Sequence, residues 1–150
     1  MTTSPSSTIS AERDRIRSLV VPTGIVTVLV SSVFTYLGAH TWQESASMIA
    51  LASVVAVGVY GFLAPRALDR PAAPGLAVAM SAIAAVITLP GFWTGLPLVL
   101  GAAGALLGFA GRGSAKGSGL SIAAMLLGLL TVIAYLTIYI VDGLVFGNSI

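Results

Sequence analysis

The chain has 150 residues, of which 57% are hydrophobic and only 8% are charged. Soluble domains carry about a quarter charged residues, so this composition excludes an ordinary soluble domain and is typical of a membrane protein. Seven Lys and Arg against five Asp and Glu leave too small a basic surplus to indicate a nucleic-acid partner. Because there is no cysteine, disulfides, thiolate metal sites and thiol catalysis are excluded as well.

Five hydrophobic segments follow a polar N-terminus. Residues 1–17 are rich in Ser and Thr, and we expect a cytoplasmic N-terminus that is disordered up to about Ser10. The hydrophobic segments are predicted to be helices at about 19–39, 46–64, 75–89, 96–111 and 119–141. They would form one transmembrane bundle over residues 18–142, followed by a short extracytoplasmic tail at 143–150. The predicted fold is therefore an all-α integral membrane protein.

The third and fourth segments are shorter than about 17 residues, the lower limit for a membrane span. The stretch LPGFWTGLP, with two prolines and two glycines, separates them. They form either one thin hairpin that crosses the membrane twice or a re-entrant pair that never fully crosses.

The positions of the cations predict the orientation. Lys and Arg precede the first segment, lie between the second and third, and lie between the fourth and fifth. With five passes they all fall on one side, which the positive-inside rule makes cytoplasmic, so the N-terminus is inside and the C-terminus outside. We expect these side chains to anchor the loops to lipid headgroups. The predicted anchors are Arg13, Arg15, Arg17, Arg66, Arg70, Arg112 and Lys116.

Two cytoplasmic connections resemble each other. Residues 61–80 and 108–125 both begin with Gly-Phe at an expected helix end, continue into a loop with two cations, and restart with Gly-Leu. Either a duplication or chance within a small apolar alphabet accounts for the match. In both cases the pattern predicts two hairpins in parallel orientation, each with a basic cytoplasmic turn.

Small residues recur four apart in the hydrophobic segments, which is the spacing of a helix-packing face in membranes. The pair Gly104/Gly108 is a GxxxG motif, which marks either a dimer face or internal packing. The predicted packing residues are Ala52, Ala56, Ala77, Ser81, Ala85, Gly104, Gly108, Ala124 and Gly128.

A stripe of hydroxyls follows one face of the first segment. It consists of Thr23, Thr27, Ser31 and Thr35. Such a stripe either lines a polar path or bonds to its own backbone and to neighbouring helices, and the second reading is favoured.

Aromatic residues stand near the expected membrane interfaces, as in an aromatic belt. The outer group is Tyr36, Trp42, Phe92, Trp93, Tyr139 and Phe146, and the inner group is Tyr60, Phe62 and Phe109.

Little in the chain indicates chemistry. The loop GRGSAKGSG at 111–119 places Lys116 before Gly117, lacks the Walker A order and follows a membrane segment, so no nucleotide is expected. His40 and Glu44 lie four apart but have no third ligand, which makes a poor metal site. We therefore predict no cofactor, no metal and no catalytic residue.

The stretch 75–141 resembles small membrane domains of unknown function that are common in actinobacteria. The matching residues are Pro97, Gly117, the run 119–124 (GLSIAA) and Leu127-Gly128, although Ala124 replaces the expected glycine. The resemblance covers less than half of the chain and implies an integral membrane protein without known catalytic residues.

These features predict a non-enzymatic, multi-pass protein of the bacterial cytoplasmic membrane, acting as an accessory or scaffold subunit. Its expected partners are the lipid bilayer and either further copies of itself or another membrane protein. The alternative is a small transporter or channel component that uses the hydroxyl stripe and the broken third and fourth segments.

Overall fold

The computed structural model describes residues 5–38, 41–69, 73–112 and 117–145 of the chain. In these ranges the chain is helical apart from short turns, and it forms no strand. The elements in order are α1 (Pro5–Gly38), α2 (Trp42–Ala56), the π-helical segment η1 (Val57–Leu63), α3 (Ala64–Leu68), α4 (Ala73–Gly91), the 3₁₀ turn η2 (Phe92–Thr94), α5 (Leu96–Gly111) and α6 (Ser118–Val145). The prediction of an all-helical membrane protein is confirmed.

Four stretches are long and apolar enough to cross a membrane, namely 14–37, 42–68, 74–94 and 118–142. By contrast, α5 has 16 residues and is about 24 Å long, less than the roughly 30 Å of a hydrocarbon core. Of the two segments predicted to be shorter than a membrane span, only the fourth segment, α5, is that short. The third is longer than expected, because α4 starts two residues earlier, at Ala73, and includes Pro90 in its last turn.

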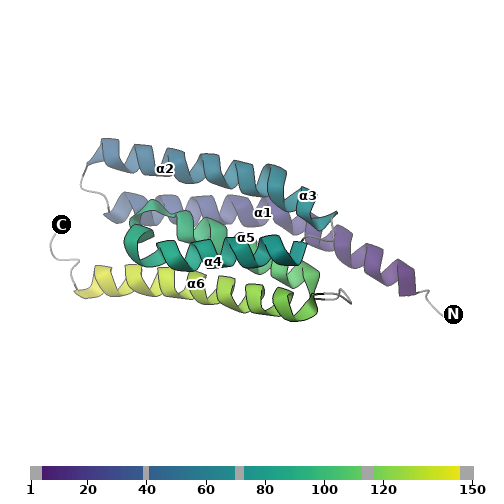
Figure 1. Cartoon of the computed structure of the whole chain (residues 1–150). Coiled ribbons are helices and arrows are strands. Elements are labelled where there is room, and N and C mark those ends of the chain that lie inside the picture. The colour runs from purple at the N-terminus through teal and green to yellow at the C-terminus, as the bar shows by residue number, and fades with distance from the viewer. Residues whose placement is uncertain (1–4, 39–40, 70–72, 113–116, 146–150) are drawn as a thin grey trace.

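The N-terminal helix starts earlier than the sequence suggested. The stretch up to about Ser10, expected to be disordered, is helical from Pro5 onward. Proline suits the first position of a helix, where its missing N–H costs nothing, and the run 11–13 (AER) contains strong helix formers. As a result, α1 extends beyond the rest of the bundle at its N-terminal end (Figure 1).

The four long apolar stretches and the short helix α5 alternate in direction along the bundle (Figure 1). The N-terminal part of α1, the end of α3 and the start of α6 lie at one end of the bundle. The start of α2 and the end of α6 lie at the other end, where Thr35 of α1 donates a hydrogen bond to the Trp93 carbonyl of η2 over 3.4 Å. The tip of the α4–α5 hairpin therefore reaches the level of the C-terminal end of α1, and the hairpin traverses the bundle.

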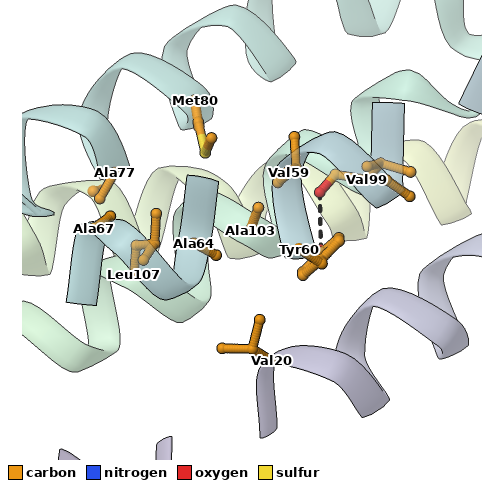
Figure 2. Packing of buried hydrophobic residues seen from close by; sticks show 12 residues of the cluster. Val20, Val59, Tyr60, Ala64, Ala67, Ala77, Met80, Val99, Ala103 and Leu107 are labelled. Atoms are coloured by element: carbon orange, nitrogen blue, oxygen red, sulfur yellow. Dashed lines mark hydrogen bonds between the residues drawn. The ribbon is translucent and has the colours of Figure 1, made fainter. Parts of the chain in front are cut away.

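The helices form two groups that meet at α5. One group is the trio α4–α5–α6, in which all three helices contact one another. The other is the N-terminal pair, α1 and the continuous helix α2–η1–α3, which packs onto α5. Figure 2 shows the largest buried cluster at this junction, where Val20, Tyr60, Val99 and Leu107 converge from three helices.

The second pass does not end at Gly61, as the Gly-Phe pattern suggested, but runs unbroken to Leu68. A proline in a regular α-helix clashes with the carbonyl four residues earlier, which for Pro65 would be that of Gly61. The turn before Pro65 is instead widened, because the Ala64 amide bonds to the carbonyl of Val59, five residues back. The π segment thus allows the helix to continue beyond Pro65 without a clash.

Candidate functional site

The short helix α5 approaches both of its trio partners at backbone distance. A Cβ atom placed on Gly108 would lie 2.6 Å from the Met125 nitrogen and from the Ser121 carbonyl oxygen of α6. One placed on Gly104 would collide with the Ser81 hydroxyl of α4. The two glycines of the GxxxG pair therefore face different helices of the same chain, so both pack internally.

The other small residues predicted for packing lie mostly in the same interfaces. A Cβ on Gly128 would come within 2.5 Å of the Gly101 carbonyl oxygen. Ala85 is only half-buried, whereas its neighbour Ala84 is fully buried, because a strict four-residue spacing drifts off a helix face of period 3.6. The remaining predicted packing residues are all buried: Ala52, Ala56, Ala77, Ser81 and Ala124.

The hydroxyl stripe of α1 faces the protein interior. Thr27, Ser31 and Thr35 are buried. Thr27 donates to the Thr23 carbonyl over 2.9 Å, and Ser31 likewise bonds to a carbonyl in its own helix. Thr35 instead reaches across to the Trp93 carbonyl. These bonds agree with the interpretation that the stripe bonds to its own backbone and to neighbouring helices. The hydroxyl donors are used within the protein and are not available to a solute.

A buried hydroxyl joins α4 to α6. Ser81 of α4 donates to the Ala124 carbonyl of α6 over 2.8 Å. Both residues are almost completely buried. This bond can form because Gly104 leaves room for the Ser81 side chain between α4 and α5.

Tyr60 lies in the π segment and points inward, unlike the interfacial position predicted for it. Its side chain is 4% exposed, and its hydroxyl donates to the Val99 carbonyl of α5 over 3.0 Å (Figure 2). The ring lies against Gly24 of α1, where a Cβ would come within 2.8 Å of it. One side chain thus ties α1, η1 and α5 together.

Tyr139 and Phe92 were also expected to form part of an outer belt, but they pack in an aromatic cluster with Phe34 and Tyr135. The Phe34 and Tyr139 rings are 5.0 Å apart, and the Phe92 and Tyr139 rings are 5.5 Å apart. The cluster joins α1, η2 and α6 at the end of the bundle where α2 starts and α6 ends. Since Trp42, Tyr36 and Trp93 are exposed there, only part of the predicted belt lies at the surface.

Two buried hydroxyls make no well-formed hydrogen bond within the described ranges, those of Ser121 and Tyr135. The Ser121 hydroxyl sits against Gly111, where no Cβ would fit. The Tyr135 ring lies 5.0 Å from the Tyr139 ring in the aromatic cluster. Both positions are explained by tight packing.

The described cations are exposed: Arg15, Arg17, Arg66 and Arg112. They belong to the N-terminal part of α1, to α3 and to the residue after α5, and the N-terminal part of α1 and the end of α3 lie at the same end of the bundle (Figure 1). Arg17 of α1 lies 3.7 Å from the Asp69 carboxylate, just past the end of α3. Of the other predicted anchors, Arg70 and Lys116 lie outside the described residues, as does the side chain of Arg13. The arrangement agrees with the sequence-based expectation that the basic segments share one side.

The two similar turns also share a contact. Arg66 lies over the Phe62 ring at 5.5 Å from its centre, and Arg112 lies over the Phe109 ring at 3.7 Å. In each case the phenylalanine comes from the repeated Gly-Phe pair. Gly108 nevertheless does not end its helix, because α5 continues to Gly111. The repeat therefore marks a cation–aromatic contact rather than a helix end.

The two sequence candidates for chemistry lie partly outside the described residues. Glu44 is exposed, and its amide donates to the Thr41 hydroxyl over 3.2 Å as part of the cap that starts α2. His40 lies outside the described residues. Among the residues that are described, no group of three potential metal-binding side chains occurs. In the loop GRGSAKGSG, residues 113–116 are not described, while Gly117 adopts a left-handed conformation at φ 101° before α6.

An apolar groove of about 350 Å³ runs between α1 and α2–η1 on the outer surface of the N-terminal pair. We call it the lateral groove. Tyr60 contributes a ring that lies against Gly24, and the exposed Gly61 leaves one part of the groove open. Its lining residues are Val21, Gly24, Ile25, Val28, Leu29, Ser53, Ala56, Val57, Tyr60 and Gly61.

Comparisons of the chain with models of known protein families, with curated proteins and with solved structures find no match. The resemblance of 75–141 to small actinobacterial membrane domains therefore stays a prediction. Function has to be inferred from the residues of the chain itself.

Proposed function

We propose that this chain is a non-enzymatic protein of the bacterial cytoplasmic membrane that serves as an accessory or scaffold subunit of a larger membrane assembly. The observation that carries the proposal is the absence of buried charged side chains among the described residues. Every acidic or basic side chain whose surroundings are described is exposed, and the buried polar groups are mainly hydroxyls that bond to nearby carbonyls. Coupled transport and proton transfer usually require ionisable groups inside the membrane.

The outer faces supply the surface that such a subunit would use. Large apolar side chains are exposed along α4 and α6, with Val86 at 74% and Leu130 at 62%. In a bilayer, lipids or the helices of a partner cover these faces. The basic turns, with their arginines over aromatic rings, would hold the bundle at a fixed depth against anionic headgroups.

The bacterial assignment and the orientation come from the sequence. The richness in Ala, Gly and Val is typical of a GC-rich bacterial genome, and the basic turns favour an internal N-terminus. The hydrogen bonds of the hydroxyl stripe favour the subunit over the transporter alternative. Thr27 and Ser31 bond within α1, and neither lines the lateral groove.

Co-purification tests the subunit proposal. The tagged full chain would be crosslinked in cells, extracted in a mild detergent and identified by mass spectrometry together with whatever it retains. We expect a second membrane protein in a fixed ratio, which a tagged unrelated membrane protein of similar size does not retain. If the chain is recovered alone, or only with copies of itself, the accessory-subunit proposal is wrong.

Two surface variants would then locate the interface. Val86→Trp alters the exposed face of α4, and Leu130→Trp alters that of α6. Each adds bulk without disturbing the core, so we expect one of them to release the partner and the other to retain it. If both retain it, the exposed faces of α4 and α6 are not the subunit interface.

A further inference from the structure

We propose that the lateral groove binds one acyl chain of an anionic glycerophospholipid from the cytoplasmic leaflet, with the lipid phosphate at Arg17 and Arg66. The inference concerns a binding site and is independent of the subunit role. It relies on the orientation in which the basic end of the bundle is cytoplasmic.

The walls of the groove suit a flexible hydrocarbon chain. Ser53 is the only lining residue with a hydroxyl that can face the groove, because the Tyr60 hydroxyl is directed away to the Val99 carbonyl. The residues from α1 follow one helix face, and those from α2–η1 follow the opposing one. At Gly61 a side chain would meet only a methyl of Val57, at 3.9 Å, so this part of the groove is open.

The dimensions favour an acyl chain over a partner helix. From Val21 to Leu29 the groove extends about 12 Å, which is close to the roughly 15 Å of one leaflet. A partner helix that crosses the membrane core spans about 30 Å, more than twice this length. A partner helix would also need a groove through the whole membrane.

Charge complements one end of the groove. Arg17 precedes Val21 by one helical turn on the same face of α1, and Arg66 follows Gly61 by five residues, one turn beyond Phe62. Both guanidinium groups are exposed, and the ion pair between Arg17 and Asp69 is 3.7 Å long and 60% exposed on the arginine side. Such an exposed pair is weak, and the guanidinium has five donors, so Arg17 can bind a phosphate while staying beside α3.

Matched variants of the full chain test the site. The protein would be purified in a mild detergent with equal amounts of phosphatidylglycerol and phosphatidylcholine, and retained lipid would be counted by native mass spectrometry. Gly61→Leu fills the groove, whereas Gly58→Leu makes the same change in the same π segment at a position that does not line it. We expect loss of bound lipid in Gly61→Leu only. Equal retention by both variants would overturn the proposal.

The headgroup is tested separately. Because a basic residue near an anionic lipid favours binding by about fivefold, Arg17→Gln and Arg66→Gln should each reduce the preference for phosphatidylglycerol about fivefold. Arg15→Gln, two residues away on the opposite side of α1, should leave it unchanged. If all three variants behave alike, the arginines do not select the lipid and this part of the proposal is wrong.

A measurement on the unaltered chain covers the case in which a variant misfolds. Phosphatidylglycerol with a photoactivatable group in its acyl chain would be crosslinked to the protein in vesicles and the product mapped by peptide sequencing. We expect enrichment in 21–29 and 53–61. Crosslinks spread evenly over the exposed faces of α1, α4 and α6 would contradict a site in the groove.

Discussion

The trio α4–α5–α6 and the N-terminal pair both contain glycines within their helices, but most of these glycines have different surroundings in the two groups. In the trio, Gly104, Gly108 and Gly128 allow backbone to approach backbone or a buried hydroxyl. In the pair, only Gly24 packs closely, against the Tyr60 ring, whereas Gly58 and Gly61 of η1 have almost no neighbours and a groove remains between the helices. Glycine in a membrane helix therefore signals close packing only where another helix is present to use the space.

The largest effect should come from adding one methyl group to the trio. In Gly108→Ala the new Cβ meets backbone atoms of α6 at 2.6 Å, and backbone cannot move aside as a side chain does. We expect the free energy of unfolding to fall by about 3 kcal/mol, at the upper end of overpacking costs. The measurement is reversible unfolding in mixed micelles with increasing denaturing detergent.

The matched control is Gly58→Ala in the pair, where nothing lies within 4 Å. It should leave stability unchanged or raise it by up to about 1 kcal/mol through helix propensity. Equal losses in the two variants would mean that the trio is not packed more closely than the pair.

The junction between the two groups should be next in sensitivity. Gly95 has φ 72°, and a Cβ there would lie 2.8 Å from the Cβ of Ser31. We expect Gly95→Ala to cost about 2 kcal/mol, from the left-handed backbone and from the contact with α1 together. Adding Ser31→Gly should restore the part due to the contact and leave the part due to the backbone. If the second change restores nothing, α1 does not lie against the start of α5.

Tyr60→Phe removes the hydrogen bond that ties η1 to α5 and keeps the ring. Because the Val99 carbonyl is then left with one partner fewer in a buried site, we expect a loss of about 1 kcal/mol in unfolding free energy. Tyr36→Phe, on an exposed ring of α1, serves as the control and should have no effect. Similar results for the two variants would argue against the inward position of Tyr60.

The smallest difference expected is between two buried serines. Ser81→Ala breaks a bond between α4 and α6 and should cost about 0.6 kcal/mol, the average for interhelical bonds in membranes. Ser31→Ala breaks a bond within α1 and should cost close to nothing. A larger loss for Ser31→Ala would contradict the view that the hydroxyl stripe is bonded to its own helix.

The sequence predicted the helices well because hydrophobic length and basic turns are strong local signals. The range 96–111 matches α5 as observed, and the small residues at 104 and 108 lie in helix interfaces. What it missed depends on distant contacts. Tyr60 and Tyr139 look like interface residues by position, yet Tyr60 turns inward to a carbonyl on another helix, and Tyr139 joins an aromatic cluster.

The π segment had a signal that was not used. Pro65 within an apolar run is compatible with either a helix end or a widened turn four to five residues earlier, and the sequence alone does not distinguish the two. The lateral groove had no comparable signal, because its existence depends on how α1 and α2–η1 diverge around the Tyr60 ring. Such features need the positions of two helices that are far apart in the sequence.

The central claim is that the short helix α5 completes a full passage through the centre of the bundle, so that the tip of the α4–α5 hairpin lies on the outer side. Since the chain has no cysteine, single cysteines report sidedness directly. Three exposed positions would be changed: Trp93→Cys at the tip, Gln43→Cys at the outer end and Arg15→Cys at the basic end. In intact cells a membrane-impermeant maleimide should label Gln43→Cys and Trp93→Cys, and label Arg15→Cys only after permeabilisation. If Trp93→Cys is instead labelled together with Arg15→Cys, the hairpin is re-entrant and the account is wrong.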